Sequence, residues 1–193
     1  MGIRWQQFVK LVVRNRVRIS ILVFVALILE DILTGVRPHN PFDIHDAMGI
    51  LGLGLVIAGL SVRSWAAGIL HKRTQLTTTG PYGIVRNPLY IGSFLLLLGF
   101  CALIADAENI WFAIGPFAIL HVLKVRQEER VLSQAFGEQW LAYVRSTPRF
   151  LPTRWPRHIF ESWRLPQWMA NREYRATITA MAGVMAVVAW RWL

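Results

Sequence analysis

The sequence has little of what disulfide scaffolds, cysteine metal centres and soluble nucleotide-binding domains require. It contains one cysteine, Cys101, which excludes a disulfide framework and a cysteine metal site. Charged residues make up 17% of the 193 residues, compared with about 25% in a typical soluble domain. The chain also lacks a P-loop, a G-x-G-x-x-G fingerprint and a nucleophile elbow. The expected class of protein is therefore not a soluble one.

Apolar residues dominate instead, and they are grouped into long runs. Hydrophobic residues account for 54% of the chain. A helix needs about 20 apolar residues to cross about 30 Å of hydrocarbon. Five segments approach that length: residues 19–36, 47–70, 89–105, 110–125 and 176–193. The sequence predicts an all-α, polytopic membrane bundle of five transmembrane helices that forms a single domain over residues 1–193.

The distribution of positive charge predicts the orientation. With a cytoplasmic N-terminus, residues 1–18, 71–88 and 124–175 lie on the cytoplasmic side and hold 18 of the 21 Lys and Arg residues. This bias matches the positive-inside rule. No cleavable signal peptide is expected at the N-terminus. In the opposite loop, Asp46 is expected to cap the second span, and the spacing of His39 and His45 matches no metal motif.

Basic and aromatic residues are interleaved over residues 153–172, before the last span. This pattern predicts an interfacial helix with Trp155, Trp163 and Trp168 at the depth of the lipid headgroups. A nucleic-acid interface is disfavoured because the tryptophans adjoin a membrane span. Glu30 and Asp31 lie near the far end of the first span, where a functional role and simple contact with water both remain open.

The segment GPYGIVRNPLYIG, residues 80–92, combines a turn, a helix start and aromatic residues. Gly-Pro indicates the turn, and Asn87 followed by Pro88 is typical of a capped helix N-terminus. Tyr82 and Tyr90 flank that terminus. Its unpaired N–H groups and the two rings can hold the carboxylate and the aromatic base of a nucleotide-like ligand. An interfacial anchor without a ligand is the alternative.

The second polar segment, EERVLSQAFGEQWLAYVRSTPRFLP, covers residues 128–152. The fourth span is expected to continue as a helix through Glu128 and Glu129, whose side chains point about 100° apart. Only one of them can easily face a given pocket, and a solvated acidic pair is the alternative. Gly137 and Pro148 predict a break, a second short helix and a turn back to the membrane.

These two segments, in this order and separated by an apolar hairpin, resemble the two signatures of the isoprenylcysteine carboxyl methyltransferase and phospholipid methyltransferase superfamily. The resemblance covers residues 60–152. It implies a methyltransferase that uses S-adenosylmethionine, with the cofactor held between the signatures at the cytoplasmic face of a bacterial inner membrane. The implied partners are the lipid bilayer and a lipophilic or amphiphilic methyl acceptor, with no metal and no nucleic acid.

The resemblance also implies site residues by position. The implied cofactor contacts are Gln75, Leu76, Thr77, Tyr82, Asn87, Pro88, Tyr90, Glu128 and Glu129. The implied substrate-facing cation is Lys124, and Arg86 or Arg126 could attract an anionic headgroup or carboxylate.

The chain departs from the family pattern at two positions. Asn87 stands where the family usually has His, and Asn cannot act as a base near neutral pH. Lys124 stands where isoprenylcysteine enzymes carry Arg, so a bidentate grip on a carboxylate is lost. The acceptor atom, whether carboxylate oxygen, phospholipid nitrogen or thiol sulfur, therefore remains open. The rival function is a membrane lipid-binding or scaffolding relative without catalysis.

Overall fold

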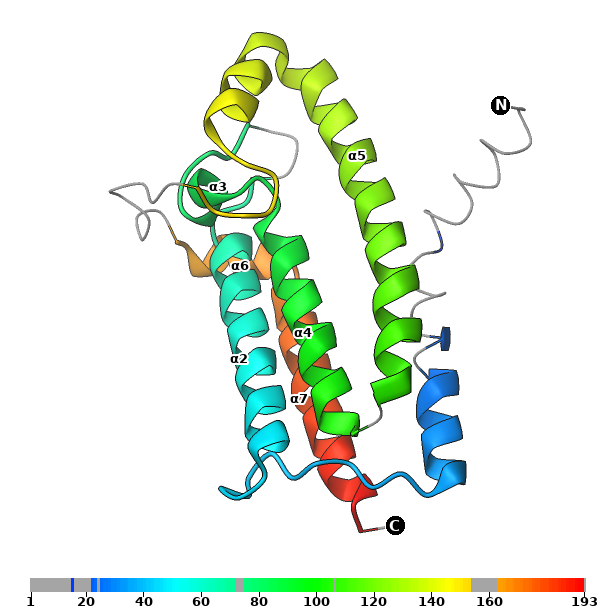
Figure 1. Cartoon of the computed structure of the whole chain (residues 1–193). Coiled ribbons are helices and arrows are strands. Elements are labelled where there is room, and N and C mark those ends of the chain that lie inside the picture. The colour runs from blue at the N-terminus through cyan, green and yellow to red at the C-terminus, as the bar shows by residue number, and fades with distance from the viewer. Residues whose placement is uncertain are drawn as a thin grey trace, which may run out of the picture.

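The computed structural model describes residues 15, 22–23, 25–71, 75–105, 107–153 and 163–192. Within these ranges all regular secondary structure is helical, which confirms the all-α class. A helical stretch over residues 25–34 precedes six further helices (Figure 1). These are α2 (Ala47–Ala67), α3 (Pro81–Ile84), α4 (Pro88–Ile104), α5 (Ala107–Ser146), α6 (Leu165–Ala170) and α7 (Glu173–Trp190).

The long helices occupy the predicted apolar segments. Among the described residues, α2 is long and apolar enough to cross a membrane, and α4 is apolar but shorter. α5 runs on past the predicted fourth segment as a helix that includes Glu128 and Glu129, as expected. Its backbone leaves helical geometry at Gly137, with φ 45° and ψ −116°, so the predicted break is confirmed.

The core lies between α2, α4 and α7. Figure 1 shows α2 and α4 side by side with α7 behind them. Val56, Leu103, Val184 and Val187 form the buried cluster, with Leu and Phe side chains packed around it. This cluster packs α2, α4 and α7 together.

Glycines let α2 and α4 approach closely. A Cβ atom at Gly99 would lie 2.8 Å from the carbonyl oxygen of Gly52, and one at Gly92 would lie 2.7 Å from that of Gly59. Both contacts are to backbone, which cannot move aside as a flexible side chain does. Small residues at this spacing on two helices are typical of close helix packing in membranes.

A buried ion pair ties α7 to α2 and α4. Arg63 donates through Nε to Glu173 Oε1 at 2.7 Å and through Nη2 to Oε2 at 2.9 Å. Its Nη1 donates to Ser93 Oγ at 2.5 Å. The side chains of Arg63 and Glu173 are 20% and 6% exposed. The charge inside the second predicted span is therefore neutralised by a residue 110 positions away.

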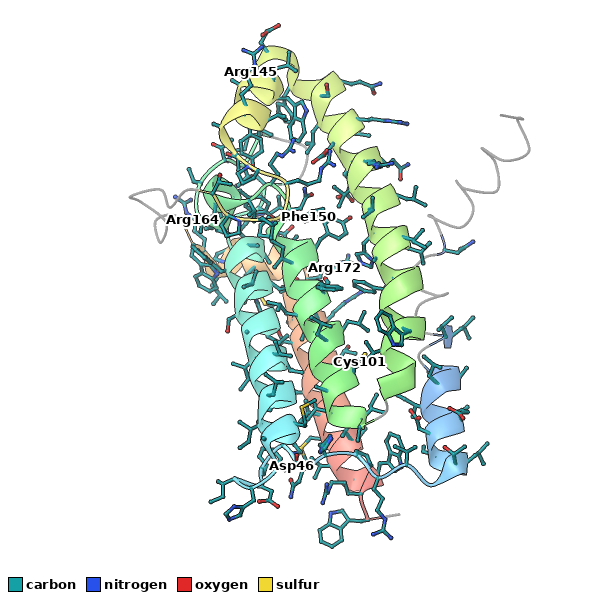
Figure 2. All side chains as sticks on the ribbon, viewed as in Figure 1. Asp46, Cys101, Arg145, Phe150, Arg164 and Arg172 are labelled. Carbon is teal, nitrogen blue, oxygen red and sulfur yellow. The ribbon has the colours of Figure 1, made fainter. Side chains whose placement is uncertain are left out.

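The two ends of the bundle differ in chemistry. At one end Asp46 accepts from the Gly49 N–H at 2.9 Å, which confirms it as the cap of α2, and it pairs with His39 at 2.8 Å. Figure 2 shows Arg145 and Phe150 at the opposite end from Asp46. The described part of the predicted interfacial segment there contains the short α6 with Trp168, whereas Trp155 lies outside the described residues.

We predict that Gly99→Ala destabilises the protein by about 1–2 kcal/mol. Overpacking against backbone costs about 1–3 kcal/mol and exceeds the gain of about 1 kcal/mol in helix propensity. The matched control is Gly54→Ala on α2, where an added Cβ meets no atom within 4 Å, so only the propensity gain remains. Thermal unfolding in detergent, followed by circular dichroism, should give a lower Tm for Gly99→Ala only. Equal Tm values would contradict the close packing.

We also predict that Glu173→Ala costs about 3–5 kcal/mol, because it leaves the Arg63 guanidinium buried without its carboxylate. The control is the double variant Arg63→Met/Glu173→Met, which removes both charges and should be much less destabilised. Denaturant unfolding of both variants and the wild type measures the difference. A double variant as unstable as the single one would show that packing, not charge, dominates here.

Candidate functional site

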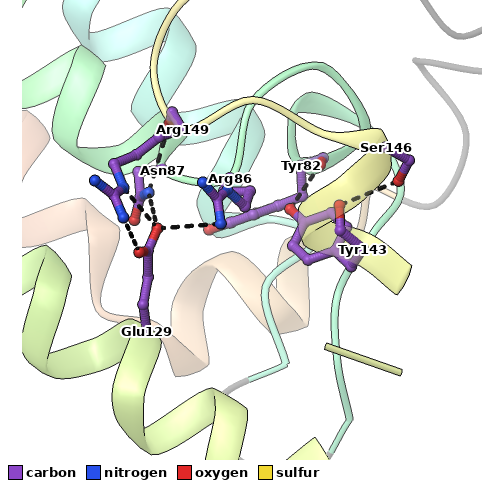
Figure 3. A network of polar contacts seen from close by, with 7 residues as sticks. All are labelled: Tyr82, Arg86, Asn87, Glu129, Tyr143, Ser146 and Arg149. Atoms are coloured by element: carbon purple, nitrogen blue, oxygen red, sulfur yellow. Dashed lines mark hydrogen bonds and ion pairs between the residues drawn. The ribbon is translucent and has the colours of Figure 1, made fainter. Parts of the chain in front are cut away.

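The residues of both predicted polar segments meet at one end of the bundle. The α3–α4 junction lies against the middle of α5 and against the turn that follows α5 (Figure 3). Gly80, with φ 59°, makes the predicted turn into α3, and Val85 returns the chain to extended geometry before α4. The Arg86 N–H then donates to the Pro148 carbonyl at 2.8 Å, which fastens the first segment to the second.

Two buried tyrosines hold this junction together. The Tyr143 hydroxyl donates to the Tyr82 carbonyl at 2.7 Å. Burial raises the pKa of the Tyr143 phenol far above its usual range, so the phenol stays protonated and can donate. Burial likewise raises the pKa of Tyr82, with a smaller contribution from the nearby Glu128 carboxylate. Both phenols therefore remain neutral hydrogen-bonding groups.

Glu129 is the centre of the polar network at this junction (Figure 3). Arg149 donates to both of its oxygens, through Nε at 3.0 Å and through Nη2 at 2.5 Å. Asn87 Nδ2 lies 3.4 Å and Arg86 Nη1 lies 3.6 Å from Oε1. The hydrogen bonds to Glu129 raise the pKa of Arg149. One carboxylate thus joins α5, the start of α4 and the turn after α5.

The prediction that the Asn87 side chain caps α4 is wrong. Asn87 is the N-cap residue by position, and Pro88 follows at the first helical position, but the Asn87 side chain makes no cap hydrogen bond. Its amide nitrogen Nδ2 instead donates to Glu129 Oε1 and to the Arg149 carbonyl, and this orients the side chain toward α5 and the turn that follows it. The N–H groups of Tyr90 and Ile91 donate to the Asn87 carbonyl, so fewer donors at this helix terminus remain for a ligand.

Glu128, the neighbouring carboxylate, faces a different group of residues. The Tyr90 hydroxyl donates to Glu128 Oε2 at 3.0 Å, and Lys124 Nζ lies 3.4 Å from Oε1. The Glu128 side chain is 43% exposed, whereas that of Glu129 is 11% exposed. The expected divergence of the two side chains is therefore seen, and Glu128 is the one accessible to a ligand.

Arg86 is held between Glu129 and an aromatic ring. Its guanidinium carbon lies 5.8 Å from the centre of the Trp140 ring, a cation–π distance. Its side chain is 10% exposed. Within the described residues, Arg86 Nε and the Tyr82 hydroxyl are buried polar atoms without a hydrogen-bond partner. The junction therefore retains polar groups that a ligand could satisfy.

The structure does not bring every predicted site residue to this place. Arg126 is exposed. It lies two positions from both Lys124 and Glu128 along α5, so its side chain points to the opposite side of the helix. Thr77 accepts a hydrogen bond from the His71 N–H at 3.2 Å, while Gln75 is exposed and Leu76 is partly buried in the same loop. Tyr82, Asn87, Pro88, Tyr90, Lys124, Glu128, Glu129 and Arg86 do lie at the junction described above.

Two residues at or near the candidate site, Arg149 and His121, were not predicted from the sequence. Arg149 gave no local signal, because its partner lies 20 residues away on the preceding helix. His121 lies two turns before Glu128 on α5, and its ring is stacked on Phe117 and edge-on to Tyr90. The spacing of His121, Lys124 and Glu128 places all three on one helix face, a signal that was present in the sequence. Among the described residues, no three His, Cys, Asp or Glu side chains group as metal ligands.

The comparisons with known proteins agree with the two signatures. The family described as phospholipid methyltransferase matches residues 46–139, which run from the cap of α2 to just past the Gly137 break in α5. The protein-S-isoprenylcysteine O-methyltransferase of Schizosaccharomyces pombe is 29% identical over 114 residues, or 55% of this chain and 48% of that protein. The chain belongs to the superfamily of phospholipid and isoprenylcysteine carboxyl methyltransferases. No solved structure matches the chain significantly.

Two bacterial relatives are named for metal resistance and not for methyl transfer. The nickel-cobalt-cadmium resistance protein NccN of Alcaligenes xylosoxydans xylosoxydans is 33% identical over 138 residues, or 67% of this chain and 62% of that protein. The cobalt-zinc-cadmium resistance protein CzcN of Cupriavidus metallidurans is 32% identical over 138 residues, which are 67% of this chain and 61% of that protein. The chain thus spans about three fifths of the length of these two relatives.

We predict that Glu129→Ala destabilises the protein by about 2–3 kcal/mol, since it leaves the buried Arg86 guanidinium without its carboxylate and removes one of the two acceptors of Asn87 Nδ2. The cost is set below that of a fully buried pair because the Arg149 side chain is 41% exposed. The matched control is Glu138→Ala, an exposed acid on the same helix, which should change stability by less than about 0.5 kcal/mol. Unfolding in detergent measures both. Equal stabilities would contradict the organising role of Glu129.

Proposed function

We propose that this protein is an S-adenosylmethionine-dependent methyltransferase that acts on a membrane-associated or lipophilic acceptor. The observation that carries the proposal is the contact of Tyr90 with Glu128. It joins the two signature segments at an accessible carboxylate, beside a junction that keeps unsatisfied polar atoms. Superfamily membership supplies the reaction class, and the local geometry supplies the candidate binding groups.

The residues present fit this cofactor. S-adenosylmethionine carries a carboxylate, an amine, ribose hydroxyls, an aromatic base and a sulfonium cation. Glu128 can accept from the amine or a ribose hydroxyl, and the buried Tyr82 hydroxyl and Arg86 Nε are polar atoms that a ligand can satisfy. The rings of Tyr82 and Tyr90 suit a cation or a base. When bound, the cofactor supplies an electrophilic methyl group whose carbon–sulfur bond breaks with the electron pair returning to sulfur.

The chain's own contribution is positioning. Methyl transfer is an in-line displacement, so alignment of the reactants is the main term a protein can supply. The Glu129 network fixes the start of α4, and with it Tyr90, against α5. Lys124 beside Glu128 adds a cation where an anionic headgroup or carboxylate of an acceptor would lie. Arg126 is exposed on the other side of α5 and is not assigned to this site.

The membrane topology is part of the proposal. We infer five spans with a cytoplasmic N-terminus, which puts the site at the cytoplasmic face of a bacterial inner membrane. The outer faces of α2 and α7 support this, because Ile57, Ile178, Met181 and Met185 are each more than half exposed. The cofactor then enters from water, while a lipophilic acceptor reaches α4 and α5 from the bilayer.

Two alternatives differ in chemistry. A non-catalytic relative that binds lipid would keep the fold and show no turnover. The names of the two bacterial relatives associate them with resistance to metals, and the same site could serve such a role by methylating a membrane component. Product formation separates catalysis from lipid binding.

The first test is calorimetric titration of S-adenosylmethionine and of its demethylated product into the purified protein in detergent. We expect Glu128→Ala to weaken binding about 10- to 100-fold, the loss of a hydrogen bond to a charged group. Glu138→Ala is the control for a generic loss of negative charge and should bind like the wild type. A folded wild type that binds neither compound would contradict the proposal.

A further inference from the structure

His121 extends the site from Glu128 toward the middle of the bundle. His121, Lys124 and Glu128 are spaced by three and four residues and share one face of α5. At about 1.5 Å per residue, His121 lies about 10 Å along the helix from Glu128, inside the predicted fourth span. The Tyr90 ring bridges the two, since its hydroxyl donates to Glu128 and its centre lies 5.3 Å from that of His121.

The contacts of His121 orient its ring and assign its proton. The ring lies 3.6 Å from the Phe117 ring with an angle of 21° between the planes, which is a stacked arrangement. Nδ1 lies 2.8 Å from the Phe117 carbonyl oxygen. A carbonyl oxygen can only accept, so Nδ1 carries a hydrogen, and Nε2 is the ring nitrogen that would gain or lose a proton.

The other groups near Tyr90 are poor bases. Both carboxylate oxygens of Glu128 are engaged, one by the Tyr90 hydroxyl and one by the Lys124 ammonium. Glu129 is occupied by Arg149, Arg86 and Asn87, and Asn87 cannot take a proton. Among the described titratable and charged groups of α4 and α5, Tyr90 contacts His121, and Lys124 and Glu128 follow it along the same face of α5.

We propose that His121 is the base that receives the proton of the methyl acceptor, an inference that rests on the proposed function. It selects acceptors that must lose a proton, namely an ammonium headgroup or a thiol. A carboxylate, already ionised at neutral pH, has no need of it. The acceptor's proton moves first to Nε2 of His121, which leaves a lone pair on the amine nitrogen or the thiol sulfur. That atom then bonds to the methyl carbon while the carbon–sulfur bond of the cofactor breaks, with its electron pair left on sulfur. The proton passes from His121 to water.

The position of His121 suits a lipid-borne acceptor. Glu128 lies at the end of the predicted span, on the side where a water-soluble cofactor enters. His121 lies deeper, on the far side of the Tyr90 ring, where an amphiphile in the bilayer would present its reactive atom. Proton acceptance by a placed side chain contributes about 10²–10⁴-fold to a rate.

The kinetic test compares the wild type, His121→Gln and, as the matched control, His45→Gln in the exposed loop at the other end of the bundle. The probes are phosphatidylethanolamine vesicles, decanethiol and S-farnesylcysteine, each supplied with radiolabelled S-adenosylmethionine. For the amine or thiol probe that the wild type methylates, we expect His121→Gln to lower kcat at least about 100-fold at neutral pH. The acid limb of the wild-type pH–rate profile should disappear, and the remaining rate should follow ionisation of the probe itself.

The controls separate this inference from the proposed function. His121→Gln should bind the demethylated cofactor within about twofold of the wild type, so a loss of that binding would show a structural role and overturn the inference. Unchanged kcat with the amine or thiol probe, or turnover of S-farnesylcysteine alone, would also overturn it. A wild type that binds no cofactor contradicts the proposed function instead.

A second measurement does not depend on turnover. Nuclear magnetic resonance of protein with ¹⁵N-labelled histidine, assigned by comparison with His121→Gln, reports which ring nitrogen carries the hydrogen. We expect the Nδ1–H form, and we expect the Nε2 resonance to shift on addition of decanethiol. An Nε2–H form, or a resonance that decanethiol does not move, would count against His121 as the base.

Discussion

The carboxylate of Glu129 is the constraint on which the arrangement of the site depends. It binds Arg149 through two hydrogen bonds and also lies beside Asn87 and Arg86, so three separate parts of the chain converge on one side chain. A charge this well enclosed is stable only while its partners stay in place. Glu129 therefore fixes the turn after α5 and the start of α4 against α5, and loss of this carboxylate would release all three.

This enclosure explains how two adjacent acids differ. Glu129 is 11% exposed and surrounded by cations, which suits a structural anchor. Glu128 points about 100° away, is 43% exposed and touches Tyr90 and Lys124. The pair thus combines a fixed carboxylate with an accessible one on the same turn of helix. The glycine contacts between α2 and α4 hold α4, which carries Tyr90, closely against α2.

Local patterns predicted the helices and the breaks but not the distant partners. Apolar runs located α2, α4 and α7, and Gly137 marked the break in α5, because chain hydropathy and glycine geometry act over a few residues. The pairing of Arg63 with Glu173 joins residues 110 positions apart, and no periodicity reports it. The sequence assigned Asn87 to capping for the same reason, since Glu129, to which its amide nitrogen donates, lies 42 positions away.

Tyr90 lies between the two parts of the proposed site, the accessible Glu128 and the imidazole of His121. Its hydroxyl touches the Glu128 carboxylate, and its ring meets the His121 imidazole two turns earlier on the same helix, α5, within the predicted apolar span. A water-soluble cofactor and a lipophilic acceptor must approach from opposite environments and meet in line. The Tyr90 ring contacts both the accessible acid and the imidazole proposed as the base, so it marks the place where the two reactants would meet. The proton released by the acceptor then stays on the bilayer side until the histidine returns it to water.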